Sequence, residues 1–357
     1  MSDKFFLGGV TPNGFSTDLG KYVNSKDYFT YILKGGAGTG KSTLMKRIAE
    51  RFANTEDVTR YFCSSDPDSL DAVVLHSSKA VIIDGTAPHV FDPKYPGVCQ
   101  KIVDLGFYWD KNMLAKNSDR IIKASDSNKQ LLLDASNSAK ALGRICEDTF
   151  SLGSYCLDTE KLEAFAQRLC RKILGRKRSS EASVSTRQLS AMTQYGYMTF
   201  TETLDRFDSI YCLRDDRFCA AGRLLSLVAE QAVRKGYDVS VSPYLIFEDT
   251  VYEHLLIDGA GTALITSAPL NRLTVRNAGS INMSRFYDRE ALKEHRGLFT
   301  ANASLIRQLS ELTAKTMKQA KAKHDELESY YIKAMDFDGL DRVCESISGE
   351  IAFRGKR

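Results

Sequence analysis

The feature that most constrains the fold of this chain is a glycine-rich run of eight residues, Gly35-Gly36-Ala37-Gly38-Thr39-Gly40-Lys41-Ser42. The run fits the pattern G-x-x-x-x-G-K-[ST], with β-prone residues 28–33 before it and a helical pattern over residues 44–49 after it. Glycines allow the backbone to curl closely around a bound group, so that several N–H groups and a helix N-terminus face one anion. The run therefore predicts a phosphate-binding loop, or P-loop.

Three residues at the end of this loop have distinct expected roles. Lys41 is a compact cation that reaches the β- and γ-phosphates, the Ser42 hydroxyl is a ligand for Mg²⁺, and Thr43 bonds a phosphate nearer the sugar. A lysine directly after the last glycine does not fit the G-x-G-x-x-G fingerprint, which disfavours a Rossmann dinucleotide site. The competing interpretation is a glycine-rich turn with a surface lysine, and the flanking strand and helix make it the weaker one.

Apolar segments alternate with helical patterns in the first part of the chain. Residues 58–63 and 80–83 are the expected second and third strands after residues 28–33. Continuously apolar strands between helices predict an α/β fold whose parallel sheet is covered by helices on both faces. The ligands of such a sheet belong at the carboxyl ends of its strands.

Asp84 closes the third of these strands in the manner of a Walker B aspartate, whose carboxylate helps hold the water shell of Mg²⁺. The alternative is a strand-end aspartate that caps a turn. Residue 85 is a glycine, so the water-activating glutamate of many motor ATPases is absent from its usual place. We therefore expect Ser42 and Asp84 at the metal, and slow hydrolysis or another group that activates water.

Two further residues follow strands at the same predicted edge. Asp66, after residues 58–63, either orients water or an acceptor or belongs to a simple Asp-Pro turn. His89, after Asp84, either senses the γ-phosphate and acts as an acid or base, or is a turn residue. Lys41, Asp84, Asp66 and His89 are thus the candidate catalytic residues.

The second half of the chain repeats the first, which predicts a tandem duplication. Leu213 lies 180 positions after Leu33, and in that register the helix after the loop has counterparts of similar type. Further on, Trp109-Asp110-Lys111 corresponds to Tyr287-Asp288-Arg289 at an offset of 178. We expect two modules, residues 1–175 and 188–357, each an α/β half followed by a helical half. A polar, basic linker at residues 176–187 joins them.

The second module lacks the residues that a phosphate needs. Asp215 and Asp216 stand where the first two glycines of the loop stand, and Ala221 replaces the lysine. Two carboxylates repel a phosphate, and the ammonium is not replaced. Arg223, two positions beyond the lysine site, supplies positive charge only in a slipped register, so we expect a degenerate module without nucleotide.

Composition sets the remaining limits. The chain has 357 residues, enough for two domains, and 49 Lys plus Arg against 45 Asp plus Glu give a formal charge of +4, too small to imply a nucleic-acid or membrane surface. Its 8 cysteines form no C-x-x-C pair, and no long apolar run follows the N-terminus. We expect reduced thiols, no metal cluster and a cytoplasmic location.

Three segments of the first module, residues 33–46, 63–71 and 83–89, together resemble an uncharacterised bacterial family of P-loop ATPases. Members of this family are similar in length, are tandem duplications, and are sometimes labelled nucleotide-kinase-like. The resemblance covers essentially the whole chain and implies the fold and ATP as the nucleotide, but no substrate. Such relatives commonly keep a phosphate loop in both halves, whereas residues 215–222 depart from the pattern here.

These observations leave three functions open. The leading one is an NTPase that binds Mg-ATP at residues 35–43 and hydrolyses it. The second is a nucleotide or small-molecule kinase, for which candidate lid arginines are Arg120, Arg144, Arg168 and Arg171. The third is a scaffold in which ATP alters how the helical regions contact a protein partner. The residues themselves do not separate ATP from GTP, and they do not indicate an oligomeric state.

Overall fold

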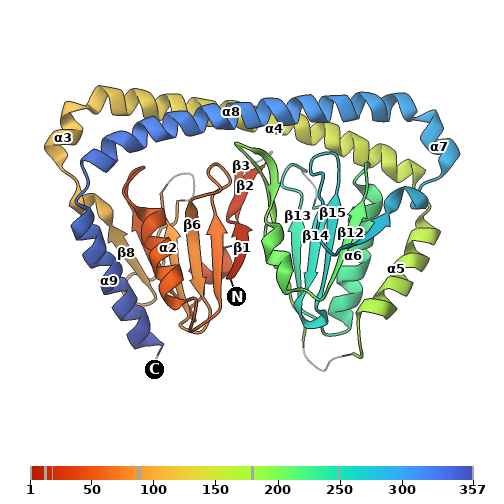
Figure 1. Ribbon diagram of the computed structural model, residues 1–357, viewed down its shortest axis with the longest axis horizontal. Coiled ribbons are helices and arrows are strands. Elements are labelled where there is room, and N and C mark those ends of the chain that lie inside the picture. The colour runs from red at the N-terminus through yellow and green to blue at the C-terminus, as the bar shows by residue number, and fades with distance from the viewer. Residues whose placement is uncertain are drawn as a thin grey trace. The chain divides into compact units, whose positions relative to one another are not determined.

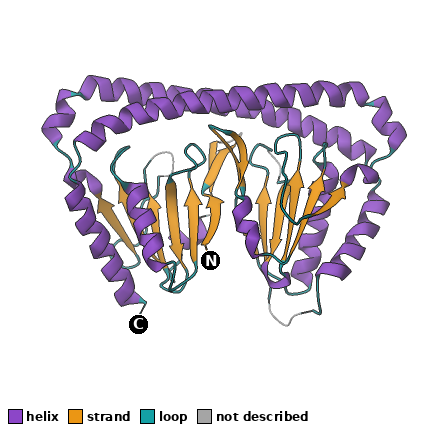
Figure 2. Cartoon of the chain, in the orientation of Figure 1, coloured by secondary structure: helices purple, strands orange, loops and turns teal. Residues whose placement is uncertain are grey.

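The computed structural model describes residues 2–11, 14–17, 19–86, 90–177, 181–247 and 250–355. The chain is an α/β protein with two modules, each built on a six-stranded mixed sheet with helices packed against it (Figure 2). Among the described residues, no helix combines the length and apolar character needed to cross a membrane.

The first sheet contains, in spatial order, β1 (Ser2–Phe6), β5 (Val58–Phe62), β6 (Leu70–Leu75), β7 (Ala80–Asp84), β4 (Phe29–Lys34) and β8 (Gln100–Asp104). Aromatic and β-branched residues dominate β4 and β7, and their side chains are almost all buried. β6 pairs antiparallel with both neighbours, whereas the other neighbouring strands pair in parallel. The carboxyl ends of β4, β5 and β7 therefore lie at one edge of the sheet.

The sheet is mixed, which corrects the expectation of a parallel one. The strand β6 is additional to the predicted ones, and a turn at residues 76–79 joins it directly to β7. Lys79 in this turn has a φ of 49°, in the left-handed region. A connection this short joins antiparallel strands, because a parallel pair needs a crossover of a dozen residues or more.

The second sheet repeats the first strand for strand. In the corresponding spatial order it contains β9 (Val184–Thr186), β13 (Val239–Pro243), β14 (Tyr252–Ile257), β15 (Thr262–Ser267), β12 (Ser209–Arg214) and β16 (Gly279–Asn282). Its one antiparallel strand, β14, holds the place of β6. The predicted duplication of the α/β part is confirmed. Within the range expected as a linker, residues 176–187, β9 pairs with β13.

Two hairpins and several helices complete the described structure. The hairpins pair β2 (Gly8–Thr11) with β3 (Gly14–Thr17) and β10 (Ser190–Thr193) with β11 (Gly196–Thr199). The α-helices are α1 (Gly20–Val23), α2 (Lys41–Phe52), α3 (Lys111–Lys116), α4 (Ser118–Cys156), α5 (Thr159–Ile173), α6 (Cys219–Arg234), α7 (Arg289–Glu294), α8 (Arg296–Lys333) and α9 (Phe337–Arg354). Short 3-10 helices are η1 (Leu105–Tyr108), η2 (Thr201–Arg206), η3 (Asp258–Ala260) and η4 (Met283–Phe286).

Aspartates begin the helices at corresponding positions of the two halves. Asp158 caps α5 and accepts a hydrogen bond from the Lys161 N–H at 3.0 Å. Asp336 caps α9 in the same way, accepting from the Gly339 N–H at 3.0 Å. The two caps are 178 positions apart, the offset expected from the sequence. A side chain that accepts from the free N–H groups of the first turn stabilises a helix by about 1 kcal/mol.

The chain forms two compact units that are not consecutive in sequence. The first unit comprises Met1–Gly9, Phe15–Ala135 and Lys315–Arg357, and the second comprises Val10–Gly14 and Ser136–Ala314. The boundaries fall within α4 and α8, so this division differs from the expected modules at 1–175 and 188–357. The last helix of each half, α5 or α9, packs on the α/β part of the other half.

In the core of the first unit, a helix from the end of the chain packs beside the helix that follows the loop. We call this arrangement, in which each half supplies a helix to the other, the exchange of helices. Leu44 and Ile48 of α2 are buried in one cluster with Leu340 and Ile347 of α9. α2 and α9 lie side by side against the sheet (Figure 1), and Arg51 pairs with Glu345 at 2.7 Å along their exposed margin. In the second unit α5 packs on α6 in the same manner. Each sheet is thus covered by a helix that the other half of the sequence supplies.

We predict that a fragment ending at residue 175 does not fold by itself. It keeps the first sheet and α2 but lacks α9, which leaves Leu44, Met45 and Ile48 partly exposed, at a cost of about 1.5–3 kcal/mol for each fully exposed side chain. That loss is comparable to the whole stability of a domain. The measurement is thermal unfolding followed by circular dichroism, and addition of a peptide covering residues 315–357 is the control. A sharp unfolding transition of the fragment alone would contradict the exchange of helices.

Candidate functional site

The glycine-rich loop lies in the first unit, between the end of β4 and the start of α2. Gly38 and Gly40 have φ angles of +69° and +79°, in the left-handed region that glycine adopts without strain. Leu105 approaches the position that a side chain on Gly35 would occupy, with 3.3 Å to its Cβ. These constraints hold the loop in a compact curve that ends at the N-terminus of α2.

Lys41 folds back over this loop. Its Nζ donates hydrogen bonds to the carbonyl oxygens of Gly35 and Gly36, each at 2.7 Å. The same ammonium lies 3.6 Å from Asp84 Oδ2, and both side chains are mostly buried. The structure thus brings together two of the predicted catalytic residues beside the N-terminus of α2, and a helix N-terminus is a position that favours anions.

Asp84 reaches this point because β7 is the direct neighbour of β4, with Leu33 opposite Asp84 in the register. One carboxylate oxygen, Oδ1, accepts from the backbone N–H of Thr86 at 2.8 Å and from its hydroxyl at 2.5 Å. The turn-capping interpretation therefore holds for Oδ1, while Oδ2 faces Lys41. The two interpretations of Asp84 are compatible, because they use different oxygens.

Ser42 and Asp66 lie at the same edge of the sheet. The Ser42 hydroxyl oxygen accepts a hydrogen bond from the N–H of Leu70, the first residue of β6, at 2.9 Å. Asp66 accepts from the Ser69 hydroxyl at 2.8 Å, and its charged partner is Lys321, at 3.5 Å. Asp66 therefore forms the expected turn and also an ion pair that the sequence did not predict.

The remaining residues of the predicted site are Ala37, Thr39, Thr43 and His89. The Thr39 hydroxyl donates to Gly36 O at 2.9 Å and stabilises the curve of the loop, Ala37 is partly buried within it, and Thr43 is exposed on the first turn of α2. His89 lies outside the described residues. Among the described residues, no cluster of three or more His, Cys, Asp or Glu side chains could hold a metal ion. A cation at this edge would rest on Ser42, Asp84 and the oxygens of its ligand.

Residues near the end of the chain also belong to the site. The C-terminal part of α8 and the start of α9 pack on the loop (Figure 1), and side chains placed on the loop glycines would collide with them. A Cβ on Gly36 would be 3.0 Å from the Tyr331 ring, one on Gly38 would be 2.7 Å from the Glu328 carbonyl oxygen, and one on Gly40 would collide with a methyl group of Leu340. The glycines are therefore required for helix packing as well as for loop conformation.

The side chains of this helix bring charge and an aromatic group to the loop. The hydrogen bond with His324 is the main reason why the pKa of Glu328 lies below its ordinary value, and the Gly38 N–H acts in the same direction. Tyr331 contacts the ring of Trp109, with 5.4 Å between centroids. The indole N–H of Trp109 is buried and finds no acceptor among the described residues. The contacts of Glu328 and Tyr331 with the loop were not predicted from the sequence, because these residues are far from the loop in sequence. The only related signal was the internal alignment, which showed that the two halves correspond.

The corresponding loop of the second unit is filled by its own side chains. Asp215 is buried and accepts hydrogen bonds from the N–H groups of Ala221 at 2.8 Å and Arg217 at 3.0 Å. The Tyr287 hydroxyl donates to the same carboxylate at 2.9 Å and accepts from the Ala220 N–H. Burial raises the pKa of Asp215, and the donated hydrogen bonds oppose that shift. A carboxylate of the chain itself thus occupies the N-terminus of α6.

The backbone of this second loop keeps part of the original geometry. Phe218, the counterpart of Gly38, has a φ of 63° although it is not a glycine, and it is fully buried. The helix α6 begins at Cys219, two positions earlier than the counterpart of Lys41. A side chain in the left-handed region is strained, and the surrounding packing must sustain it. The side chain of Phe218 and the earlier start of α6 thus distinguish this loop from the glycine-rich loop of the first unit.

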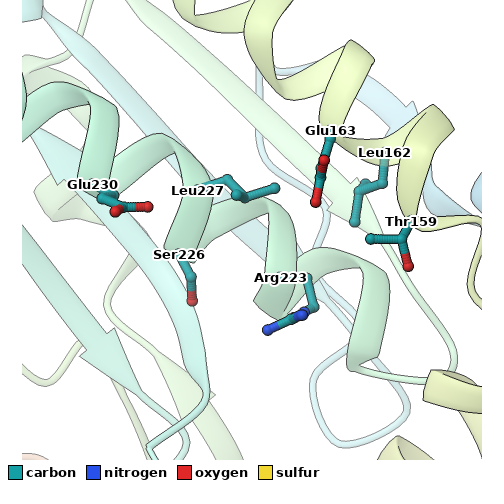
Figure 3. Close-up of a pocket in the computed structure, with 7 residues that line it drawn as sticks. All are labelled: Thr159, Leu162, Glu163, Arg223, Ser226, Leu227 and Glu230. Carbon is teal, nitrogen blue, oxygen red and sulfur yellow. The ribbon is translucent and has the colours of Figure 1, made fainter.

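A small cavity of about 170 Å³ lies between α5 and α6 in the second unit (Figure 3). It is lined by Thr159, Leu162, Glu163, Arg223, Ser226, Leu227 and Glu230. Its one arginine is accompanied by two glutamates, so the lining does not favour an anion. The volume is also below the range typical of ligand pockets, about 300–1,000 Å³. Arg223 therefore does not rebuild a phosphate site in the second unit.

Comparison of the chain with models of protein families, with curated proteins and with solved structures finds no match.

We predict that Asp215→Ala lowers the free energy of unfolding by about 1–3 kcal/mol, because it leaves buried N–H groups without an acceptor. Urea denaturation of the full chain measures the effect. Asp216→Ala is the matched control, since this neighbour pairs with Arg272 at the exposed surface and such pairs contribute about 0–1 kcal/mol. Equal losses in the two variants would show that Asp215 does not hold the second loop together.

Proposed function

We propose that the chain is a P-loop nucleoside triphosphatase that binds Mg-ATP at residues 35–43 of the first unit. The observation that carries this proposal is the convergence of Lys41 and Asp84, 3.6 Å apart, at the mouth of a loop whose glycines take left-handed conformations. β7 ends at Asp84 and its neighbour β4 leads into the loop before Lys41, which supports the assignment of both residues to one site. The choice of ATP rests on the resemblance described above.

The chain's own residues account for binding and charge stabilisation. N–H groups of the loop and of the first turn of α2 face the phosphates, and Lys41 exchanges the carbonyl oxygens of Gly35 and Gly36 for phosphate oxygens. Ser42 and Asp84 are the residues that would hold Mg²⁺, which supplies positive charge to the phosphates. Asp84 Oδ1 stays engaged with Thr86, which orients the other oxygen. Residue 85 is glycine, so slow turnover is expected.

A kinase is the less favoured alternative. Three of its four candidate lid arginines, Arg144, Arg168 and Arg171, belong to the second unit, whereas the loop belongs to the first. Arg144 pairs with Glu147 on its own helix at 3.1 Å. Arg120, the candidate that belongs to the first unit, is exposed, so its burial gives no sign of a lid over the loop.

A nucleotide-dependent scaffold is favoured by one specific observation. The loop packs directly against α8, a helix of 38 residues, through Tyr331 and Glu328. Any change of the loop on nucleotide binding therefore acts on this helix, and slow turnover fits a binding role. We propose a protein partner for the helical regions only if the chain is such a scaffold. Hydrolysis of ATP would then return the loop to its nucleotide-free state.

We predict that Lys41→Ala weakens Mg-ATP binding about 10–100-fold, because the loop loses a charge-assisted hydrogen bond of about 1.5–3 kcal/mol. Phosphate release should fall at least as far. Binding is measured by calorimetry or by tryptophan fluorescence, since the chain has 1 tryptophan and Trp109 contacts Tyr331 beside the loop.

The matched control is Arg223→Ala, which removes a cation at the start of α6 and should leave both measurements unchanged. Phosphate release without an acceptor favours the hydrolase, and labelling of an added nucleotide or metabolite favours the kinase. Unaltered ATP binding and turnover in Lys41→Ala would defeat the proposal.

A further inference from the structure

The C-terminal part of α8 presents a polar face to the loop of the first unit. Lys321, His324 and Glu328 follow one another at helical spacings of three and four, so they share one side of the helix. Glu328 packs on Gly38, and Lys321 pairs with Asp66 at the carboxyl edge of the sheet. This face therefore reaches from the loop to Asp66, which lies in the turn between β5 and β6.

Lys321 is held as a charged group at that edge. Its side chain is only 17% exposed, and its two carboxylate partners are Asp66, at 3.5 Å, and Asp325 on its own helix. Burial alone would lower its pKa, but the hydrogen bond with Asp325 and the charge of Asp66 outweigh burial, so the pKa lies above its ordinary value. The ammonium therefore stays charged in a mostly buried position at the carboxyl edge of the sheet.

A short chain of contacts connects Lys321 with the predicted metal ligand. Lys321 pairs with Asp66, Asp66 accepts from the Ser69 hydroxyl, and the N–H of Leu70, the next residue, donates to Ser42. The Ser42 hydroxyl is where the cation and the terminal phosphates would meet. Lys321 and Lys41 therefore approach this edge from different elements, α8 and α2.

The second unit provides an internal comparison. At the offset of 178 that relates α4 to α8, Lys321 corresponds to Gly143, His324 to Cys146 and Glu328 to Phe150. Gly143 packs against the backbone of Ile246, and Cys146 is buried. The helix face that is polar over the intact loop is thus apolar in the unit whose loop is filled by Asp215. The polar side chains of α8 therefore occur beside the glycine-rich loop, and their counterparts on α4 are not polar.

We propose that Lys321 binds the γ-phosphate of ATP, as a second cation that the last part of the chain supplies to the site; this rests on the proposed function. In the free protein Asp66 and Asp325 hold the ammonium near its working position. ADP lacks the group that Lys321 contacts, so Lys321 makes the site distinguish ATP from ADP. A cation at this position also opposes the charge that develops on the transferred phosphoryl group.

The test compares Lys321→Met with Lys323→Met in the full chain. Lys323 is a lysine of the same helix, pairs with Glu326 and is 45% exposed, so its variant controls for loss of charge on α8. Dissociation constants of Mg-ATP and Mg-ADP are measured by Trp109 fluorescence. We expect Lys321→Met to weaken ATP about tenfold and ADP less than twofold, and Lys323→Met to change neither. Lys321→Arg, which keeps the charge, should restore most of the ATP affinity.

The outcomes separate this inference from the function on which it rests. If the wild-type chain binds Mg-ATP and Lys321→Met keeps the wild-type ratio of ATP to ADP affinity, Lys321 only pairs with Asp66 and the inference is overturned, while the proposed function stands. If the wild-type chain binds neither nucleotide, both fail. If Lys321→Met unfolds, Lys321→Gln serves in its place, because it retains a hydrogen-bond donor for Asp66, and the same loss of ATP preference is expected.

Discussion

The structure of each unit depends on how the N–H groups at the start of one helix are satisfied. The central strand, β4 or β12, leads into α2 or α6, and the first turn of such a helix has donors without partners inside the helix. In the second unit Asp215 accepts from these donors and the site is closed. In the first unit glycines take the place of that carboxylate, and Lys41 crosses the loop instead. The same element of the two sheets thus has two arrangements, a buried carboxylate at the helix start in the second unit and glycines crossed by a lysine in the first.

The sequence predicted the parts of the fold and site that depend on neighbouring residues. The strand before the loop, the helix after it and the approach of Asp84 to Lys41 all follow from local pattern and from adjacent strands. β6 was beyond such reasoning, because a buried antiparallel strand has the same continuous apolar pattern as a parallel one. The contacts of Glu328 and Tyr331 with the loop were also beyond it, since they join residues almost 300 positions apart.

The internal duplication carried more information than any single motif. The offset of 178 relates Asp158 to Asp336 at two helix caps, and it relates the polar face of α8 to the apolar face of α4. Alignment within the chain showed that the halves correspond, but it could not show on which sheet each helix packs. That choice depends on the long helices α4 and α8, each of which contributes residues to both compact units. A periodic pattern along a helix indicates an apolar face without naming its partner.

The exchange of helices also bears on how such a gene can change. In an ordinary tandem duplication a copy that has lost its ligand is dispensable, and a deletion can remove it without harm to the other. Here α9, encoded after the degenerate copy, covers the hydrophobic core beside the intact loop. A deletion that removed the second half would also remove Leu340 and Ile347 from that core. The second half of the sequence is therefore retained together with the glycine-rich loop for mechanical reasons, because it supplies part of the core on which that loop's unit depends.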